Sequence, residues 1–184
     1  MKRQSRETAF KVIYQIDMGK NDMETALQIT MNNDGLNQKE QLFCRQLVLA
    51  VEEQLDEIDQ MIQRNTTGWT IDRMMSVDRN LLRLAVYEIV YGGHITPGGA
   101  INEAVELAKV YGQKRSSAFV NSILDKVMKN EEKRSGNIVE AAEDAEETTA
   151  QETDAAQAEP VVIMHEISEE EAERLMHANR NEIE

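Results

Sequence analysis

Cysteine, proline and aromatic residues are all scarce in this chain of 184 residues. Its one cysteine cannot form an internal disulfide or a thiol-based metal cluster, which fits a reducing compartment. No apolar run approaches the ~20 residues that a membrane-spanning helix needs. The charged N-terminus also lacks the apolar stretch of a secretory signal. These absences predict a cytoplasmic protein with no membrane segment.

Basic residues are in the minority, with 20 Lys and Arg against 34 Asp and Glu and a net charge of −14. Such a balance argues against a nucleic-acid partner, which is itself a polyanion. The charges are unevenly placed, however. Residues 1–130 carry 16 basic and 17 acidic side chains, whereas residues 131–184 carry 4 and 17. The excess of negative charge therefore belongs to the last 54 residues, and the partner of the first 130 stays open.

The same boundary separates the residues that can form a core from those that cannot. All eight aromatic residues precede position 120. We therefore predict a folded domain over residues 1–130 and an acidic, mostly disordered tail over 131–184. Residues 168–171 have the form of a capping box and predict one short tail helix near 168–178. The tail is either a solubilising extension or a polyanion that competes with nucleic acid for basic side chains.

Apolar residues recur at spacings of three and four, and no segment alternates convincingly with period two. This pattern predicts an all-α fold, a compact bundle of about seven helices. Ser5, Thr70, Ser76 and Thr96 are candidate N-caps, and Pro97 suits the first position of a helix. The third helix contains no Gly or Pro, so we expect it to be continuous. The expected helices cover residues 6–18, 22–31, 38–64, a short segment from 70, 77–91, 97–111 and a last helix from 116.

Residue patterns for catalysis are missing. Cys44 has no His near it in the sequence, and a buried apolar role is the simpler interpretation. Glu103 and Glu106 stand at i,i+3 but lack the second Glu-x-x-His element of a carboxylate metal site. The Gly pairs at 92–93 and 98–99 have neither the preceding strand nor the following Lys of a phosphate loop. We expect no metal, no cofactor and no enzymatic activity.

Two short basic segments carry a different chemistry. Lys2, Arg3 and Arg6 lie near the N-terminus, with Arg3 and Arg6 at i,i+3. Lys114 and Arg115 precede a helix whose first N–H groups can receive a phosphate. Near them, at residue 119, a Phe lies at the edge of its helix's apolar stripe. Lys and Arg side chains can hold the RNA backbone while an unstacked base lies on the Phe ring, which is the chemistry of single-stranded RNA binding. The ordinary alternatives are that the charges are simply solvated and that the Phe belongs to the core.

Four segments resemble the NusB family of bacterial transcription antitermination proteins. They are RETAFKVIYQ, VDRNLLRLAVYE, AINEAVELAK and FVNSILD, which cover residues 6–15, 77–88, 100–109 and 119–125. The resemblance is colinear over about residues 3–129. It departs at Ser122, where the family usually has Gly, and in the acidic tail, which has no counterpart in the family.

The resemblance implies a helical fold of two subdomains and a role without catalysis. Such proteins bind the boxA element of nascent ribosomal RNA together with NusE, a small-subunit ribosomal protein. The pair helps to assemble an antitermination complex on RNA polymerase. Family members occur as monomers and as homodimers, so the oligomeric state stays open. For Asp78 and Arg79, at the start of the central helix, the resemblance implies a role in RNA binding less strongly than it does for the other positions. The implied RNA-binding residues are Lys2, Arg3, Arg6, Arg79, Lys114, Arg115, Ser116 and Phe119.

Two other interpretations stay open. The domain could be a protein–protein adaptor that binds the NusE-like partner but has little RNA binding of its own. It could also be a NusB-like domain cut from an RNA methyltransferase. The absence of a Gly-rich nucleotide-binding pattern after residue 130 argues against this last alternative.

Overall fold

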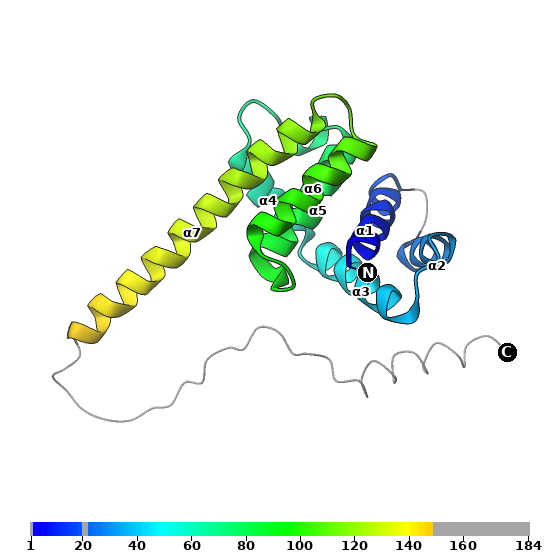
Figure 1. Cartoon of the computed structure of the whole chain (residues 1–184). Helices are drawn as coiled ribbons and strands as arrows, with labels where there is room; N and C mark the ends of the chain where they lie inside the picture. Colours follow the sequence, from blue (N-terminus) through cyan, green and yellow to red (C-terminus); the bar gives the residue numbers. More distant parts are fainter. Residues whose placement is uncertain (1, 20–21, 149–184) are drawn as a thin grey trace. The chain divides into compact units, whose positions relative to one another are not determined.

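The computed structural model describes the backbone of residues 2–19 and 22–148, and the side chains of 2–19 and 22–134. Within this part every regular element is helical (Figure 1). The elements are α1 (Lys2–Asp17), α2 (Met23–Asn33), α3 (Gln38–Glu53), α4 (Leu55–Asn65), the 3₁₀ turn η1 (Ile71–Arg73), α5 (Ser76–Tyr87), the π-helical turn η2 (Glu88–Gly92), α6 (Pro97–Tyr111) and α7 (Ser116–Thr148).

The predicted all-α fold is confirmed, but the prediction of one continuous helix over 38–64 is wrong. The backbone breaks at Gln54, where φ is −101° and ψ is 14°. No Gly or Pro causes this break. The two halves have different main partners, α1 for α3 and α5 for α4, although α3 also touches α5. Val51 of α3 and Ile58 of α4 are both completely buried. The stability gained by burying both apolar side chains therefore outweighs the local preference of this segment for a single helix.

Cap predictions had mixed outcomes. The Thr96 hydroxyl accepts a hydrogen bond from the Gly99 N–H at 3.2 Å, with Pro97 at the first helical position, as predicted. Ser5 is not an N-cap, because α1 already begins at Lys2 and Ser5 is completely buried inside it. Ser76 is the first residue of α5 rather than its cap. Thr70 precedes η1 but makes no capping hydrogen bond through its side chain.

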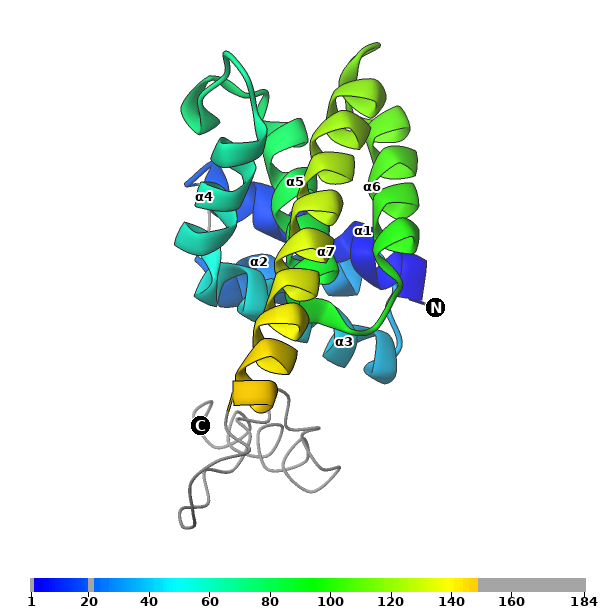
Figure 2. The ribbon, with the colours of Figure 1, turned by 90° about the vertical axis from the view of Figure 1, so that its left-hand side faces the viewer.

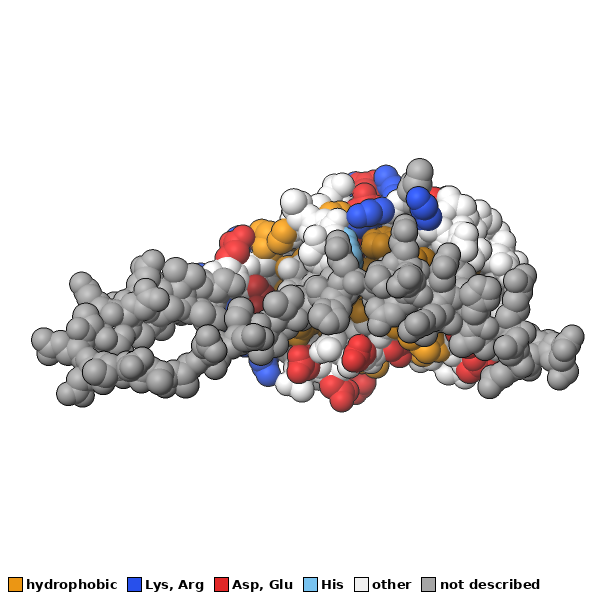
Figure 3. Space-filling view, turned by 90° about the horizontal axis from the view of Figure 1, so that it is seen from below, with side chains coloured by type: hydrophobic (Ala, Val, Ile, Leu, Met, Phe, Trp, Pro, Cys, Tyr) orange, Lys and Arg blue, Asp and Glu red, His pale blue; other side chains and the backbone are white. Residues whose placement is uncertain are grey.

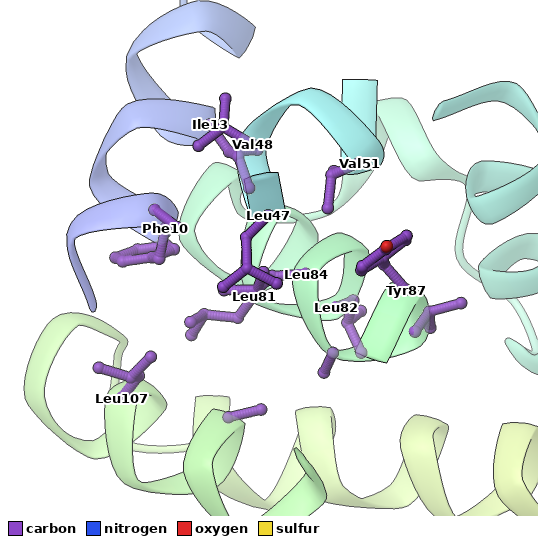
Figure 4. Packing of buried hydrophobic residues seen from close by; sticks show 14 of the residues in the cluster. Phe10, Ile13, Leu47, Val48, Val51, Leu81, Leu82, Leu84, Tyr87 and Leu107 are labelled. Carbon is purple, nitrogen blue, oxygen red and sulfur yellow. The ribbon is translucent and has the colours of Figure 1, made fainter. Parts of the chain in front are cut away.

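Helix α5 lies at the centre of the core, as its nearly continuous apolar surface predicts. It contacts α1, α3, α4 and α6, and Figure 2 shows it between α4 and α6. Helices α1, α2 and α3 pack on one another as a second group. Side chains from α1, α3, α5 and α6 meet in one cluster (Figure 4). Phe10, Leu47, Leu82 and Leu107 in this cluster are at most 4% exposed. Truncating such a Leu to Ala costs about 2–5 kcal/mol.

Helix α7 continues past residue 130, where the predicted domain ends. Contacts divide the chain into Met1–Glu143 and Asp144–Glu184, and residue 130 lies inside α7. The predicted disordered tail therefore overlaps α7 up to Thr148. Residues 149–184, including the expected short helix near 168–178, lie outside the described residues. In the described part, none of the helices is long and apolar enough to cross a membrane.

Candidate nucleic-acid interface

Lys2 and Arg3 lie exposed on the first turn of α1. The Lys2 ammonium is 5.5 Å from the centre of the Phe43 ring, and the His94 ring meets the same Phe at 5.6 Å. The Arg3 Nε is 3.9 Å from the Glu103 Oε2, and the Arg3 side chain remains 58% exposed. At that distance and exposure the ion pair is weak. Lys and Arg side chains gather beside a histidine at one edge of the face in Figure 3.

Arg6 is placed differently from Lys2 and Arg3. Its Nε donates to both carboxylate oxygens of Glu88, at 2.7 and 2.9 Å, and the two side chains are 5% and 2% exposed. Its guanidinium carbon is also 5.7 Å from the centre of the Phe43 ring. Arg6 is therefore buried and engaged by Glu88, unlike the exposed Lys2 and Arg3. It fixes the first turns of α1 to η2 and so orients the exposed cations before it.

Lys114 and Arg115 form the exposed tip of the turn between α6 and α7. Neither makes an ion pair with a side chain in the described part of the chain. The Ser116 hydroxyl accepts a hydrogen bond from the Gln113 N–H at 2.8 Å and is 3% exposed as a residue. A Cβ at Gly112 would lie 2.4 Å from the Ser116 Cβ, so the turn requires Gly at that position. Ser116 thus shapes the turn through this hydrogen bond.

Phe119 lies partly exposed on the first turn of α7, as its edge position predicts. Its ring meets the Trp69 ring edge to face, with 6.3 Å between the ring centres. Trp69 and Met75 are about half exposed, at 52% and 51%. Together with Arg115 these side chains line a pocket of about 670 Å³, which we call the Trp69–Phe119 pocket. The sequence shows Trp69 next to a Gly in a loop, but no spacing rule connects it with residue 119.

Arg79 belongs to an internal network and not to the exposed surface. Its guanidinium donates to Asp17 at 2.6 Å and to the Ile71 carbonyl at 3.2 Å, and its side chain is 15% exposed. Arg83 bridges the same Asp17 to Asp59 on α4. Although burial alone would raise the pKa of Asp17, hydrogen bonds from these arginines and from Asn80 lower it. Arg79 therefore ties η1, and with it the Trp69 loop, to α1.

Helix α6 connects the two exposed basic segments. Glu103, in the middle of α6, lies beside Arg3, and Tyr111, at its end, donates a hydrogen bond to Glu7 of α1. A rise of about 1.5 Å per residue places Glu103 and Gly112 about 14 Å apart along the helix. Both basic segments therefore border the same helix. Among the described residues no group of three or more His, Cys, Asp or Glu side chains could hold a metal ion.

Comparisons with known proteins agree on one family. Residues 3–129 match the model of the NusB family. A transcription antitermination protein NusB from Desulforamulus reducens is 42% identical over 131 residues, which cover 71% of this chain and 92% of the relative. The solved structure of T. maritima NusB superposes with a TM-score of 0.66 at 35% identity, covering 70% of this chain and 91% of that one. A structure of the antitermination factors NusB and NusE in complex with dsRNA gives a TM-score of 0.65 at 28% identity, covering 70% and 96%.

Proposed function

Because the chain belongs to the NusB family, we propose that it is a transcription antitermination factor that acts by binding RNA and protein and not by catalysis. We propose as its ligands the boxA element of nascent ribosomal RNA and a NusE-type ribosomal protein. This protein and its NusE-type partner would together join an antitermination complex on RNA polymerase. The solved complex of a NusB with NusE and double-stranded RNA supports these classes of partner.

One observation carries the RNA half of the proposal. Lys114 and Arg115 are exposed and form no ion pair within the described part of the chain, and Arg115 lines the same pocket as the partly exposed Trp69 and Phe119. Cations hold a phosphate backbone while aromatic faces stack unpaired bases. Lys2 beside Phe43 and Arg3 beside Glu103 of α6 form a second exposed basic segment. For Arg6, Arg79 and Ser116 we propose a positioning role, because their polar groups are engaged inside the domain.

The number of exposed cations gives a quantitative test. Four phosphate contacts predict a slope of about −2.8 in a plot of log affinity against log salt for single-stranded RNA. The measurement is fluorescence anisotropy of a labelled boxA-type RNA with the full chain, with and without NusE. The variant K114Q/R115Q should lose about half of that slope.

A matched control carries the same change of charge away from the pocket. K133Q/R134Q removes two exposed cations from α7, about 20 Å along that helix from Phe119. It should leave the slope close to that of the natural chain. A slope that K114Q/R115Q does not change would refute this RNA face. If NusE binds but no RNA does, the protein–protein adaptor is the better interpretation.

A further inference from the structure

The exposed side of α7 carries a row of basic side chains that begins at the Trp69–Phe119 pocket. Successive residues of an α-helix are about 100° apart, so positions three and four apart fall on one side. The Phe119 N–H donates to the Arg115 carbonyl oxygen at 3.0 Å, so the helical spacing already starts at residue 115. Along α7, side chains that are not buried recur within an arc of about 80°. We call this set the α7 basic stripe, and it consists of Arg115, Phe119, Ser122, Lys126, Lys129 and Lys133.

The acids of α7 lie outside this arc. Where the side chains of the helix are described, its acids are Asp125, Glu131 and Glu132. Asp125 borders the stripe and accepts a hydrogen bond from the Lys129 Nζ at 2.6 Å. These two side chains are 42% and 60% exposed, so their ion pair is weak and a phosphate can replace the carboxylate. Lys126 and Lys133 form no ion pair with any described side chain. The stripe is therefore positively charged along its length, which is about 27 Å.

The domain holds this part of α7 in place. Leu124 and Val127, on the opposite side of the helix, are at most 1% exposed. The Asn130 side-chain amide donates to the Asn65 Oδ1 at the end of α4, at 2.7 Å. The lysines of the stripe therefore keep a fixed distance from the pocket. The match to the NusB family ends at residue 129, whereas α7 continues to Thr148, so the outer end of the stripe lies beyond the family pattern.

We propose that the α7 basic stripe binds the backbone of the RNA strand where it leaves the Trp69–Phe119 pocket, so that the protein holds a longer RNA than the boxA element alone. This inference rests on the proposed function and lengthens its RNA-binding surface. The stripe shares Arg115 and Phe119 with the pocket, and this continuity favours the same RNA strand over a separate acidic protein. Beyond Phe119 the stripe has no aromatic or apolar side chain, so it contributes affinity for phosphates and no base preference.

The experiment compares RNAs that differ only in length. Anisotropy is measured with the full chain and three labelled RNAs: a boxA-type RNA, and the same RNA with about eight uridines added at its 5′ or its 3′ end. The boxA-type RNA should keep a slope of about −2.8 in the plot of log affinity against log salt. The stripe leads away from the pocket in one direction, so one of the two longer RNAs should reach it. Three further phosphate contacts should steepen the slope for that RNA by about 2.1.

The decisive variant is K126Q/K133Q, which removes the two lysines of the stripe that have no ion pair. It should reduce the added slope from about 2.1 to about 0.7 and leave the slope for the boxA-type RNA unchanged. The matched control is K39Q/K109Q, which removes two exposed lysines from α3 and α6. That control should keep the full difference between the short and the long RNA.

The outcomes separate this inference from the proposed function. Equal slopes for the boxA-type RNA and both longer RNAs refute the stripe and leave the RNA face intact. An added slope that K126Q/K133Q does not reduce refutes it as well. If K126Q/K133Q instead weakens the binding of NusE in the absence of RNA, the stripe is a protein contact and the proposal is overturned. Binding of no RNA at all, with NusE present, refutes the proposed function and this inference together.

Discussion

The buried ion pair between Arg6 and Glu88 allows a test of whether Arg6 holds the fold or binds RNA. Both side chains are at most 5% exposed, and the Arg6 Nε reaches both carboxylate oxygens within 2.9 Å. Removing one partner leaves the other buried without compensation, which costs about 3–5 kcal/mol. We therefore expect Arg6→Met and Glu88→Gln each to lower the free energy of unfolding by this amount.

The double variant R6M/E88M distinguishes loss of the pair from loss of a charge. With both charges gone, the apolar replacements should recover most of the lost stability, because buried pairs are often no better than hydrophobic residues of similar size. The measurement is urea unfolding of the full chain, followed by circular dichroism. Lys129→Gln breaks the exposed pair with Asp125, whose side chains are 60% and 42% exposed, and should cause no measurable change.

The same variants then answer the RNA question. If Arg6 only positions the cations before it, R6M/E88M should keep the salt slope of the natural chain. A phosphate contact by Arg6 instead predicts a slope shallower by about 0.7. Two results would refute the structural role: single variants that cost under about 1 kcal/mol, or a stable double variant with the shallower slope.

Three further predictions concern the rest of the domain. Burial raises the pKa of the Cys44 thiol to about 12, so alkylation of the native chain at pH 8 should be on the order of a thousandfold slower than in urea, and equal rates would contradict its burial. Hydrogen bonds from Arg79 and its neighbours outweigh burial and lower the pKa of Asp17 below 3.8, so its contribution is present at neutral pH and is lost as the pH falls through its folded pKa. Asp17→Asn should therefore flatten the fall of unfolding free energy in acid, and an unchanged acid profile in urea titrations would count against the network. Gly112→Ala places a Cβ 2.4 Å from the Ser116 Cβ and should lower stability by about 1–3 kcal/mol, whereas an unchanged urea midpoint would show that the turn adapts.

The fold was largely predictable because helical periodicity is a local property. The apolar stripes located α1, α2, α5 and α6 to within a few residues, and Thr96–Pro97 marked the start of α6 correctly. The break at Gln54 was not predictable, since it depends on which helices the two halves meet. The π-helical turn that follows α5 was missed for a related reason. It carries Glu88, whose partner Arg6 is 82 residues away in the sequence.

For the candidate site, too, the sequence did not show which of the predicted cations are exposed and which are buried in ion pairs. Composition and motif position identified Arg115 and Phe119, which the structure places together at one pocket, and Lys114, which precedes Arg115 in the exposed turn. The same reasoning also selected Arg6, which forms an internal ion pair instead. A cation in a sequence motif is not distinguished from a buried one until its long-range partner is known. Trp69 was missed because only the folded loop brings it to the other aromatic ring.

The distribution of acids explains how a nearly neutral domain can present a basic surface. Residues 1–130 carry 16 basic and 17 acidic side chains, so their mean charge gives no attraction for RNA. Several acids are engaged inside the domain, as Glu88 is with Arg6 and Asp17 is with Arg79 and Arg83. Because each such pair removes one cation along with one acid, the pairs leave the net charge of the domain unchanged, and the charge that RNA meets depends on where the remaining exposed cations and acids lie. Electrostatic attraction at this face is therefore a local property, which the net charge of −14 for the whole chain conceals.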